Sequence, residues 1–320
     1  MKISSLIDIV EGKLENKPSI SFVTKIHINI AKIDDGDAFI VSNKRDIPRA
    51  IEQGAFAILY ENSVDIIDTE IAWVQIPSVQ KAMTNILRYK FSKQESIQFF
   101  YVDKILYHFL EIFKSKDFPV VLLKDNLKIN FETIISKNIT QDSMIFSYDN
   151  YFLQKVFPAF KILQPSKHSI YNLTSFTLFD TTFSYKGVLF NNLKIPKLYI
   201  DHFLTIYNFF DKKIDLKKVN NFALLKPLFI NRSLHIVPNG QSNRFILANK
   251  NIDICRYELR YLNKEYRYGT IKVIDKQKIT NEQILRYLKK YTTNIIYFKY
   301  IDISTIEAIL LQNNQELSLF

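Results

Sequence analysis

Glycine is scarce in this 320-residue chain: only six are present, and none lies between Gly54 and Gly187. A backbone loop that closes around phosphate needs glycines, because a residue without Cβ adopts positive φ freely and lets the backbone approach the ligand. The one Gly-Lys pair, Gly12-Lys13, follows no predicted strand and has no upstream glycine. A glycine-rich nucleotide loop is therefore excluded from residues 55–186.

Cysteine and long apolar runs are also missing. Cys255 is the only cysteine, so no disulfide can form within the chain, and we interpret its thiol as a buried bystander. No window of 18 uninterrupted apolar residues predicts a transmembrane helix. Residues 1–17 carry charges throughout and lack the apolar segment of a signal peptide. These absences favour a cytoplasmic location.

Familiar catalytic and metal-binding patterns are absent too. The five histidines stand far apart, without the close His or Cys partners that a zinc site uses. Asp201-His202 is not a dyad, because adjacent residues of a helix face different directions. The acidic group Asp34, Asp35 and Asp37 is interpreted as a solvated turn rather than a metal site. We therefore assign no catalytic residue, expect no cofactor and expect no metal.

The residues that are abundant describe a globular, basic protein. Hydrophobic residues make up 47% of the chain, and the formal net charge is +11. A basic protein can favour nucleotides, nucleic acid or an anionic membrane, but here the lysines are scattered, with the densest patch at Lys212-Lys213 and Lys217-Lys218. Tyrosines alternate with basic residues over 257–268, which can stack on single strands, although packing is the preferred interpretation. Nucleic acid is thus not the expected partner.

The best-ordered stretch is residues 34–61, which predict a strand, a helix and a second strand. A turn at Asp35-Gly36 precedes the apolar strand 39–41. Asp46 is placed to cap a helix whose apolar residues share one face, and Gly54 ends it. Residues 55–60 then form an apolar run typical of a buried parallel strand.

The rest of the chain continues this alternation and predicts an α/β fold in three parts: residues 1–95, 96–226 and 227–320. We expect a helix over 2–14, one or two strands over 20–30, a strand over 71–76, a helix from Val79 and a polar linker at 92–96. The second part is expected to hold a mostly parallel sheet. Its predicted elements are strands 97–102, 118–123 and 144–147, a helix over 103–114, a hairpin over 175–190 and a helix over 199–210. In the third part we expect a hairpin over 234–248, strands 270–274 and 294–298, and helices over 252–263, after Thr280 and after a Ser304 cap.

Three stretches resemble one family. Gly36-Asp37-x-Phe39-Ile40, followed by Ala50-Ile51-x-x-Gly54-Ala55-x-Ala57-Ile58, is similar to the N-terminal domain of the Mur ligases, the ATP-dependent peptide ligases of peptidoglycan synthesis. Residues 175–196 resemble late strands of the family's central domain. Pro227 and Arg232 match the junction before its third domain, where Asn231 replaces a glycine and Leu234 a glutamate.

The resemblance implies a small N-terminal substrate domain, a reduced central nucleotide-type domain and a truncated Rossmann-like C-terminal domain. The family binds ATP with a P-loop after the first central strand, but here strand 97–102 runs directly into Asp103-Lys104. The chain therefore looks like a degenerate member without that loop. The family's Asp-Ser-Arg would fall at residues 29–31, and its Asp-Gly-His has no counterpart before Asp46.

By position, the resemblance implies a small set of ligand-binding candidates: Asn29, Ser42, Lys44, Arg45, Lys104 and Arg232. The leading hypothesis is a non-catalytic binding or scaffold protein of peptidoglycan precursor synthesis, with a UDP-muropeptide or a Mur enzyme as partner. One alternative is a divergent ATP-dependent peptide ligase whose phosphate site is rebuilt around Lys104. Another is a basic protein that binds nucleic acid or a membrane surface.

Overall fold

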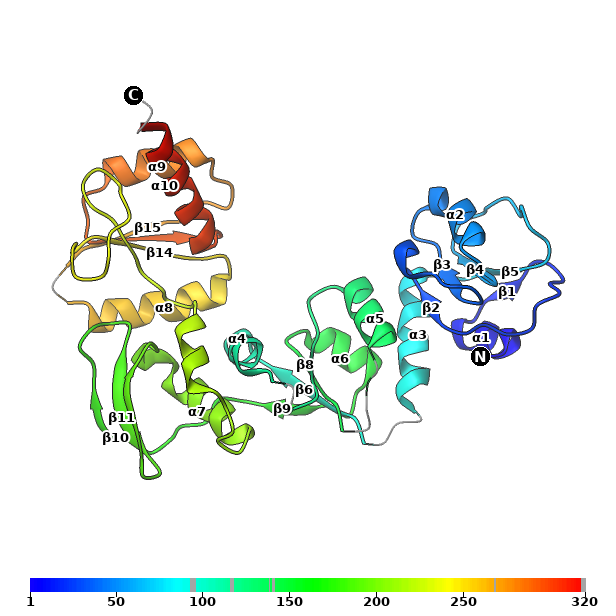
Figure 1. Cartoon of the computed structure of the whole chain (residues 1–320), viewed down its shortest axis with the longest axis horizontal. Coiled ribbons are helices and arrows are strands. Elements are labelled where there is room, and N and C mark those ends of the chain that lie inside the picture. Colours follow the sequence, from blue (N-terminus) through cyan, green and yellow to red (C-terminus); the bar gives the residue numbers. More distant parts are fainter. Residues whose placement is uncertain (93–95, 116–117, 138, 140–141, 268, 318–320) are drawn as a thin grey trace. The chain divides into compact units, whose positions relative to one another are not determined.

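The computed structural model describes residues 1–92, 96–115, 118–137, 139, 142–267 and 269–317. The chain forms two compact units, residues 1–164 (unit 1) and 165–320 (unit 2). Each unit contains two sheets with helices packed on them, so the predicted α/β class is confirmed (Figure 1). The finer division into three domains at residues 95 and 226 stays a prediction. No described helix is long and apolar enough to cross a membrane.

The first sheet of unit 1 is five-stranded, in the order β1-β5-β4-β3-β2, and only β1 is antiparallel to its neighbour. Alternate strand residues are buried on both faces: Ile40 and Leu59 pack with α1, whereas Phe39 and Ile58 pack with α2. This explains the continuous apolar runs of its strands. The elements are α1 (Ile3–Val10), β1 (Lys13–Leu14), β2 (Ile26–His27), β3 (Ala38–Ile40), α2 (Ile47–Glu52), β4 (Ala57–Tyr60) and β5 (Ala72–Gln75).

The strand, helix and strand predicted over residues 34–61 are confirmed, with local corrections around them. Gly54 has φ +91°, and a Cβ there would lie 2.9 Å from the Cα of Asp35, so this turn requires glycine. The first helix ends at Val10, earlier than predicted, because Glu11 adopts a left-handed conformation. Asp46 precedes α2 but makes no side-chain cap; instead Asn43 caps the 3₁₀ turn η2 (Lys44–Asp46).

The second sheet of unit 1 is fully parallel, which agrees with the mostly parallel sheet predicted for this part, and its strand order is β7-β8-β6-β9. The helix α3 (Val79–Ser92) packs with α1 on one side and with α5 and α6 on the other, so one hydrophobic core extends through unit 1 (Figure 1). Residues 93–95 of the predicted linker lie outside the described residues. The elements are β6 (Gln98–Val102), α4 (Lys104–Phe113), β7 (Val120–Leu122), α5 (Leu127–Ser136), β8 (Met144–Ser147), α6 (Asn150–Val156) and β9 (Lys161–Leu163).

Unit 2 begins with an antiparallel sheet of β10 (Tyr171–Thr174), β11 (Thr181–Tyr185) and β12 (Val188–Leu193). The predicted hairpin turn is confirmed, with positive φ at both Lys186 and Gly187, the geometry that matches strand twist. Phe190 of this sheet packs against Phe203 and Tyr207 of α7 (Ile200–Phe209). The 3₁₀ turns η3 (Lys197–Tyr199) and η4 (Leu216–Asn221) flank α7.

The second sheet of unit 2 has the order β13-β14-β16-β15, with three parallel strands and an antiparallel β13. The helix α8 lies on one face, and α9 and α10 lie on the other (Figure 1). The elements are β13 (Leu228–Phe229), β14 (Phe245–Asn249), α8 (Ile252–Glu265), β15 (Ile271–Ile274), α9 (Asn281–Lys290), β16 (Ile295–Lys299) and α10 (Ile303–Leu317).

The predicted helix over 252–263 and strands 270–274 and 294–298 are confirmed, whereas two other predictions for this part are wrong. The expected hairpin over 234–248 does not form, because β14 pairs with β13 and β16, and Leu234 has φ +64°, which interrupts an extended run. The last helix begins at Ile303, so Ser304 lies inside it rather than capping it. Thr280 does cap α9, in a reciprocal capping box with Gln283.

A buried carboxylate ties α8 to other parts of unit 2. Glu258 is 1% exposed and accepts hydrogen bonds from the hydroxyls of Tyr199, at 2.7 Å, and Tyr297. Burial raises the pKa of Glu258 to about 7, although both hydroxyls stabilise its charged form. The carboxyl therefore titrates close to neutral pH.

Candidate functional site

A groove crosses unit 1 at the carboxyl ends of β2, β3 and β4. It consists of three cavities of about 530, 280 and 530 Å³ that share lining residues: the first two share Ser42 and Lys128, and the last two share Gln80. The helices α3, α5 and α6 supply the opposite wall. Ligands of parallel α/β sheets bind outside the carboxyl ends of the strands, so we take this unit 1 groove as the candidate site.

The end of the groove nearest β2 contains Glu132, a carboxylate carried by α5. Its Oε1 accepts hydrogen bonds from the backbone N–H groups of Ile28, at 2.6 Å, and Asn29, at 2.9 Å. Its Oε2 lies 3.1 Å from His27 Nδ1 and 3.7 Å from Lys32 Nζ. Burial opposes ionisation, but these hydrogen bonds outweigh it and hold the pKa of Glu132 below its ordinary value.

The middle of the groove has mixed polar character. Ser42 and Lys44 line it from the segment after β3, and Lys44 Nζ donates to the carbonyl of Ser63 at 2.5 Å. Glu61, after β4, accepts a hydrogen bond from the backbone N–H of Val79 at 3.0 Å and so stabilises the start of α3. Lys128 enters from α5. The strand ends therefore offer both donors and acceptors to a ligand.

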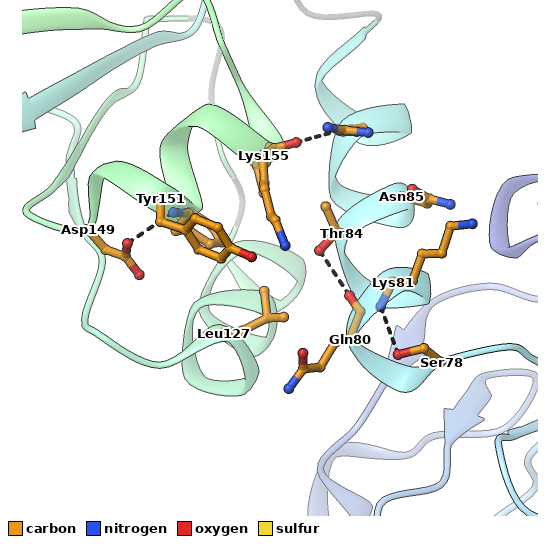
Figure 2. Close-up of a pocket in the computed structure, with 12 residues that line it drawn as sticks. Ser78, Gln80, Lys81, Thr84, Asn85, Leu127, Asp149, Tyr151 and Lys155 are labelled. Carbon is orange, nitrogen blue, oxygen red and sulfur yellow. Dashed lines mark hydrogen bonds between the residues drawn. The ribbon is translucent and has the colours of Figure 1, made fainter.

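The far section, between α3 and α6, carries three of the six basic side chains that line the groove (Figure 2). Lys155 points from α6 toward α3, and its ammonium group lies 4.1 Å from the centroid of the Tyr151 ring. Arg88 donates from its side chain to the backbone carbonyl of Lys155, which joins the two helices. Lys81 pairs with Glu11 at 2.6 Å. Three cations and one lining carboxylate, Asp149, suit an anionic ligand that carries hydroxyl or amide groups.

The resemblance described above implies a P-loop position at the junction between β6 and α4. Only Asp103 separates the two elements, and its Oδ1 accepts a hydrogen bond from the backbone N–H of Leu106 at 2.7 Å. The ammonium group of Lys104 lies 5.3 Å from the ring centroid of Tyr148. The lysine therefore packs on an aromatic ring beside the neighbouring strand end.

A carboxylate also caps the helix that follows the adjacent strand β8. Asp149 follows it and accepts a hydrogen bond from the backbone N–H of Phe152 at 3.0 Å, at the start of α6. The chain leaves β6 toward β7 and leaves β8 toward β9, in opposite directions, so this is the topological switch point of the sheet. At both helix N-termini a carboxylate of the protein already occupies the position that favours an anion.

The structure brings three of the six predicted ligand residues together. Asn29 and Ser42 line one cavity of the groove, and Ser42 and Lys44 line the next. Arg45 is exposed and lies outside the lining, and Lys104 lies at the β6–α4 junction. Arg232 is exposed in unit 2. Ligand binding by all six stays a prediction.

Several groove residues escaped the sequence analysis: Lys81, Arg88, Lys128, Glu132 and Lys155. Two of the helices that carry them, α5 and α6, were not predicted. The available signal was the capping residues Asn126 and Asp149, each of which accepts from the backbone N–H three residues later. Among the described residues, no three His, Cys, Asp or Glu side chains gather as a metal site would require.

No protein-family model and no curated protein sequence matches the chain. Solved structures do match: MurF from Acinetobacter baumannii has a TM-score of 0.55 at 8% identity, with 97% of this chain and 98% of that chain covered. The MurF ligase from Thermotoga maritima in complex with ADP has a TM-score of 0.53 at 14% identity, with 92% and 98% covered. At such identities the likeness concerns the fold, and the chain has the multidomain α/β fold of these ligases.

Proposed function

We propose that this protein acts in peptidoglycan precursor synthesis as a non-catalytic binding or scaffold protein, which recognises a UDP-muropeptide in the unit 1 groove. The observation that carries the proposal is the β6–α4 junction, where a single aspartate stands in place of a phosphate loop. The fold and the groove support a UDP-muropeptide as the ligand. The β6–α4 junction supports the absence of ATP-dependent ligase activity.

Transfer of a phosphoryl group from ATP depends almost entirely on positioning and on neutralising phosphate charge. Backbone N–H groups of a glycine-rich loop normally supply much of that neutralisation. Here the strand and the helix are joined by one residue, and Asp103 and Asp149 place negative charge at both helix N-termini. Two like charges 4 Å apart repel by about 4 kcal/mol at an effective dielectric constant of 20, so a triphosphate is disfavoured at this edge.

The groove itself favours an anionic, polar ligand. Six basic side chains and four carboxylates line its three cavities, an excess of two positive charges: Lys32, Lys44, Lys81, Arg88, Lys128 and Lys155 against Asp46, Glu61, Glu132 and Asp149. Ser42, Asn85 and Gln80 add donors and acceptors from side chains that do not titrate. A diphosphate with an attached amino sugar and acidic peptide presents the matching groups, and the separate cavities suit an extended molecule.

Isothermal titration calorimetry with UDP-N-acetylmuramoyl peptide tests the proposal. We expect saturable binding that weakens at least tenfold in Lys128→Ala, because Lys128 lines two of the cavities and the loss of one charge-assisted contact costs about 1.5–3 kcal/mol. Lys17→Ala is the control, since it removes the same charge from an exposed position outside the groove. Absence of saturable heat, or equal effects of the two substitutions, would contradict the proposed ligand site.

The divergent-ligase alternative depends on Lys104. Its ammonium group lies over the Tyr148 ring, so a catalytic role would require the side chain to leave that contact. If the alternative holds, Lys104→Ala abolishes ATP-dependent turnover. The proposal made here expects no turnover in either protein.

A further inference from the structure

A cluster of tyrosine and lysine side chains lies on unit 2 beside α9 and β15. Tyr287 and Tyr291 have parallel rings, with centroids 6.0 Å apart and an interplanar angle of 9°. Lys272 and Lys290 hold their ammonium groups 4.7 and 5.5 Å from the Tyr291 centroid, and Lys276 lies 5.5 Å from that of Tyr287. We call these five residues the tyrosine–lysine platform.

Local structure explains why the five meet. Tyr287 and Tyr291 are four residues apart at the C-terminal end of α9, so their rings share one side of the helix. Lys272 lies two residues before Ile274 on the edge strand β15, so both side chains point to the same face, and Ile274 is buried against Ile284 and Leu288 of α9. The lysine stem therefore runs toward α9, just outside the core. Lys276 follows β15 and approaches from the next turn.

The surroundings of the platform are strongly basic. Residues 271–291 contain six basic and two acidic side chains, an excess of four positive charges. Asp275, one of the two acids, is already paired with Lys299 at 2.6 Å. Lys278, Arg286 and Lys289 are exposed nearby in the sequence. The platform therefore belongs to a segment with a clear excess of positive charge.

Three cation–π contacts converge on one tyrosine pair, and all of them fall between residues 272 and 291. The ring quadrupoles offset part of the repulsion among the ammonium groups, and they hold the lysines in place while leaving N–H donors free for an anion. A phosphate chain can bridge neighbouring lysines without reordering them.

We propose that this surface binds single-stranded nucleic acid. Lysines would contact successive phosphates, and a base could replace an ammonium group on a tyrosine face, which is how single-strand sites combine charge with stacking. An anionic membrane fits less well, because in the described segment 271–291 the only large apolar side chain counted as exposed is Val273, at 36%. The inference is independent of the proposed muropeptide site.

Fluorescence anisotropy with a labelled oligothymidylate of about 16 nucleotides, the upper site size of one single-strand domain, tests the inference on the full chain. The variant Lys272→Gln/Lys276→Gln/Lys290→Gln should bind at least tenfold more weakly. Its log–log salt slope should fall by about 2, since each phosphate contact to a single strand contributes about 0.7. The control Lys213→Gln/Lys217→Gln/Lys264→Gln makes the same charge change at other exposed positions and should change affinity less than twofold.

Two further ligands separate stacking from simple charge attraction. An abasic strand of equal length keeps the phosphates but lacks the bases, and we expect it to bind about tenfold more weakly. Vesicles of anionic phospholipid should not compete with the oligonucleotide. Equal losses in both triple variants, equal affinity for the abasic strand, or binding to vesicles without binding to the strand would each overturn the proposal.

Discussion

The carboxylate of Asp103 accepts a hydrogen bond from the backbone N–H of Leu106 at 2.7 Å, at the first turn after the opening strand of the second sheet. This contact caps α4 and places a negative charge at the helix N-terminus. The same carboxylate therefore stabilises the fold and disfavours a bound phosphate. In this chain the fold seen in the Mur ligase structures has a one-residue junction between β6 and α4, and Asp103 is that residue.

Removing this cap should reduce stability without creating a nucleotide site. Asp103→Ala should lower the free energy of unfolding of unit 1 by about 1 kcal/mol, the usual cost of losing an N-cap. Urea unfolding followed by fluorescence reports on unit 1 directly, because the single tryptophan, Trp73, is buried in β5. Asp103→Asn keeps a capping oxygen and should be nearly neutral. A stabilised alanine variant would contradict this role.

Glu132 should make unit 1 sensitive to acid. Its pKa is lowered in the folded protein, so it contributes stability that is present above its unfolded pKa and is lost as pH falls through its folded pKa. Trp73 fluorescence in urea between neutral pH and about pH 3, below the ordinary carboxyl pKa, should show this loss.

The matched variant Glu132→Gln keeps an acceptor for Ile28 and Asn29 but loses the charge beside His27 and Lys32. At neutral pH it should be less stable by about 1.5–3 kcal/mol, the range for hydrogen bonds to charged groups. Its stability should also change less with pH. An unchanged acid profile would show that other carboxyls control the acid unfolding of unit 1.

Glu258 should make unit 2 less stable as pH rises, which is the opposite of the pH dependence expected from Glu132 in unit 1. Its folded pKa of about 7 lies above the ordinary value of 4.5, so the folded state holds an extra proton between these values. Stability is therefore greatest below the ordinary pKa and decreases as pH rises from about 4.5 to 7, by roughly 3 kcal/mol from the linkage relation.

Native-state hydrogen exchange on α8 and β16 measures this effect, because both carry residues of the Glu258 cluster. Glu258→Gln should flatten the dependence between pH 4.5 and 7 while it keeps a neutral, hydrogen-bonding side chain. Tyr297→Phe removes one hydroxyl donor to the carboxylate and should raise the pKa further. A pH dependence that persists in Glu258→Gln would assign it to another group.

Much of the fold follows from local pattern. The stretch 34–61 combines a turn, a short helix and two apolar strands, and these local preferences agree with the buried parallel sheet that forms. The reciprocal pair Thr280 and Gln283 also specifies its helix locally. Where several short-range signals agree, the local sequence is enough to predict the element.

Other elements depend on contacts distant in the chain. The Asn239-Gly240 turn suggested a hairpin, yet β14 forms the sheet interior by pairing with β16, about fifty residues further on. The capping residues of α5 and α6 were not recognised in the sequence. The groove residues Lys128 and Lys155, which these helices carry, were therefore not predicted. Glu132 bonds to Ile28 across 104 residues, a relationship that no local spacing encodes.

Nucleotide binding and phosphate release measured together test the central claim most directly. The purified full chain is titrated with a non-hydrolysable ATP analogue and Mg²⁺ by calorimetry, and the same sample is assayed for amino-acid-dependent phosphate release from ATP in the presence of UDP-muropeptide. The closed β6–α4 junction predicts no saturable nucleotide binding and no phosphate release, in the natural protein and in Asp103→Ala alike. Tight ATP binding with phosphate release that depends on an amino acid would contradict the claim and identify the protein as a ligase.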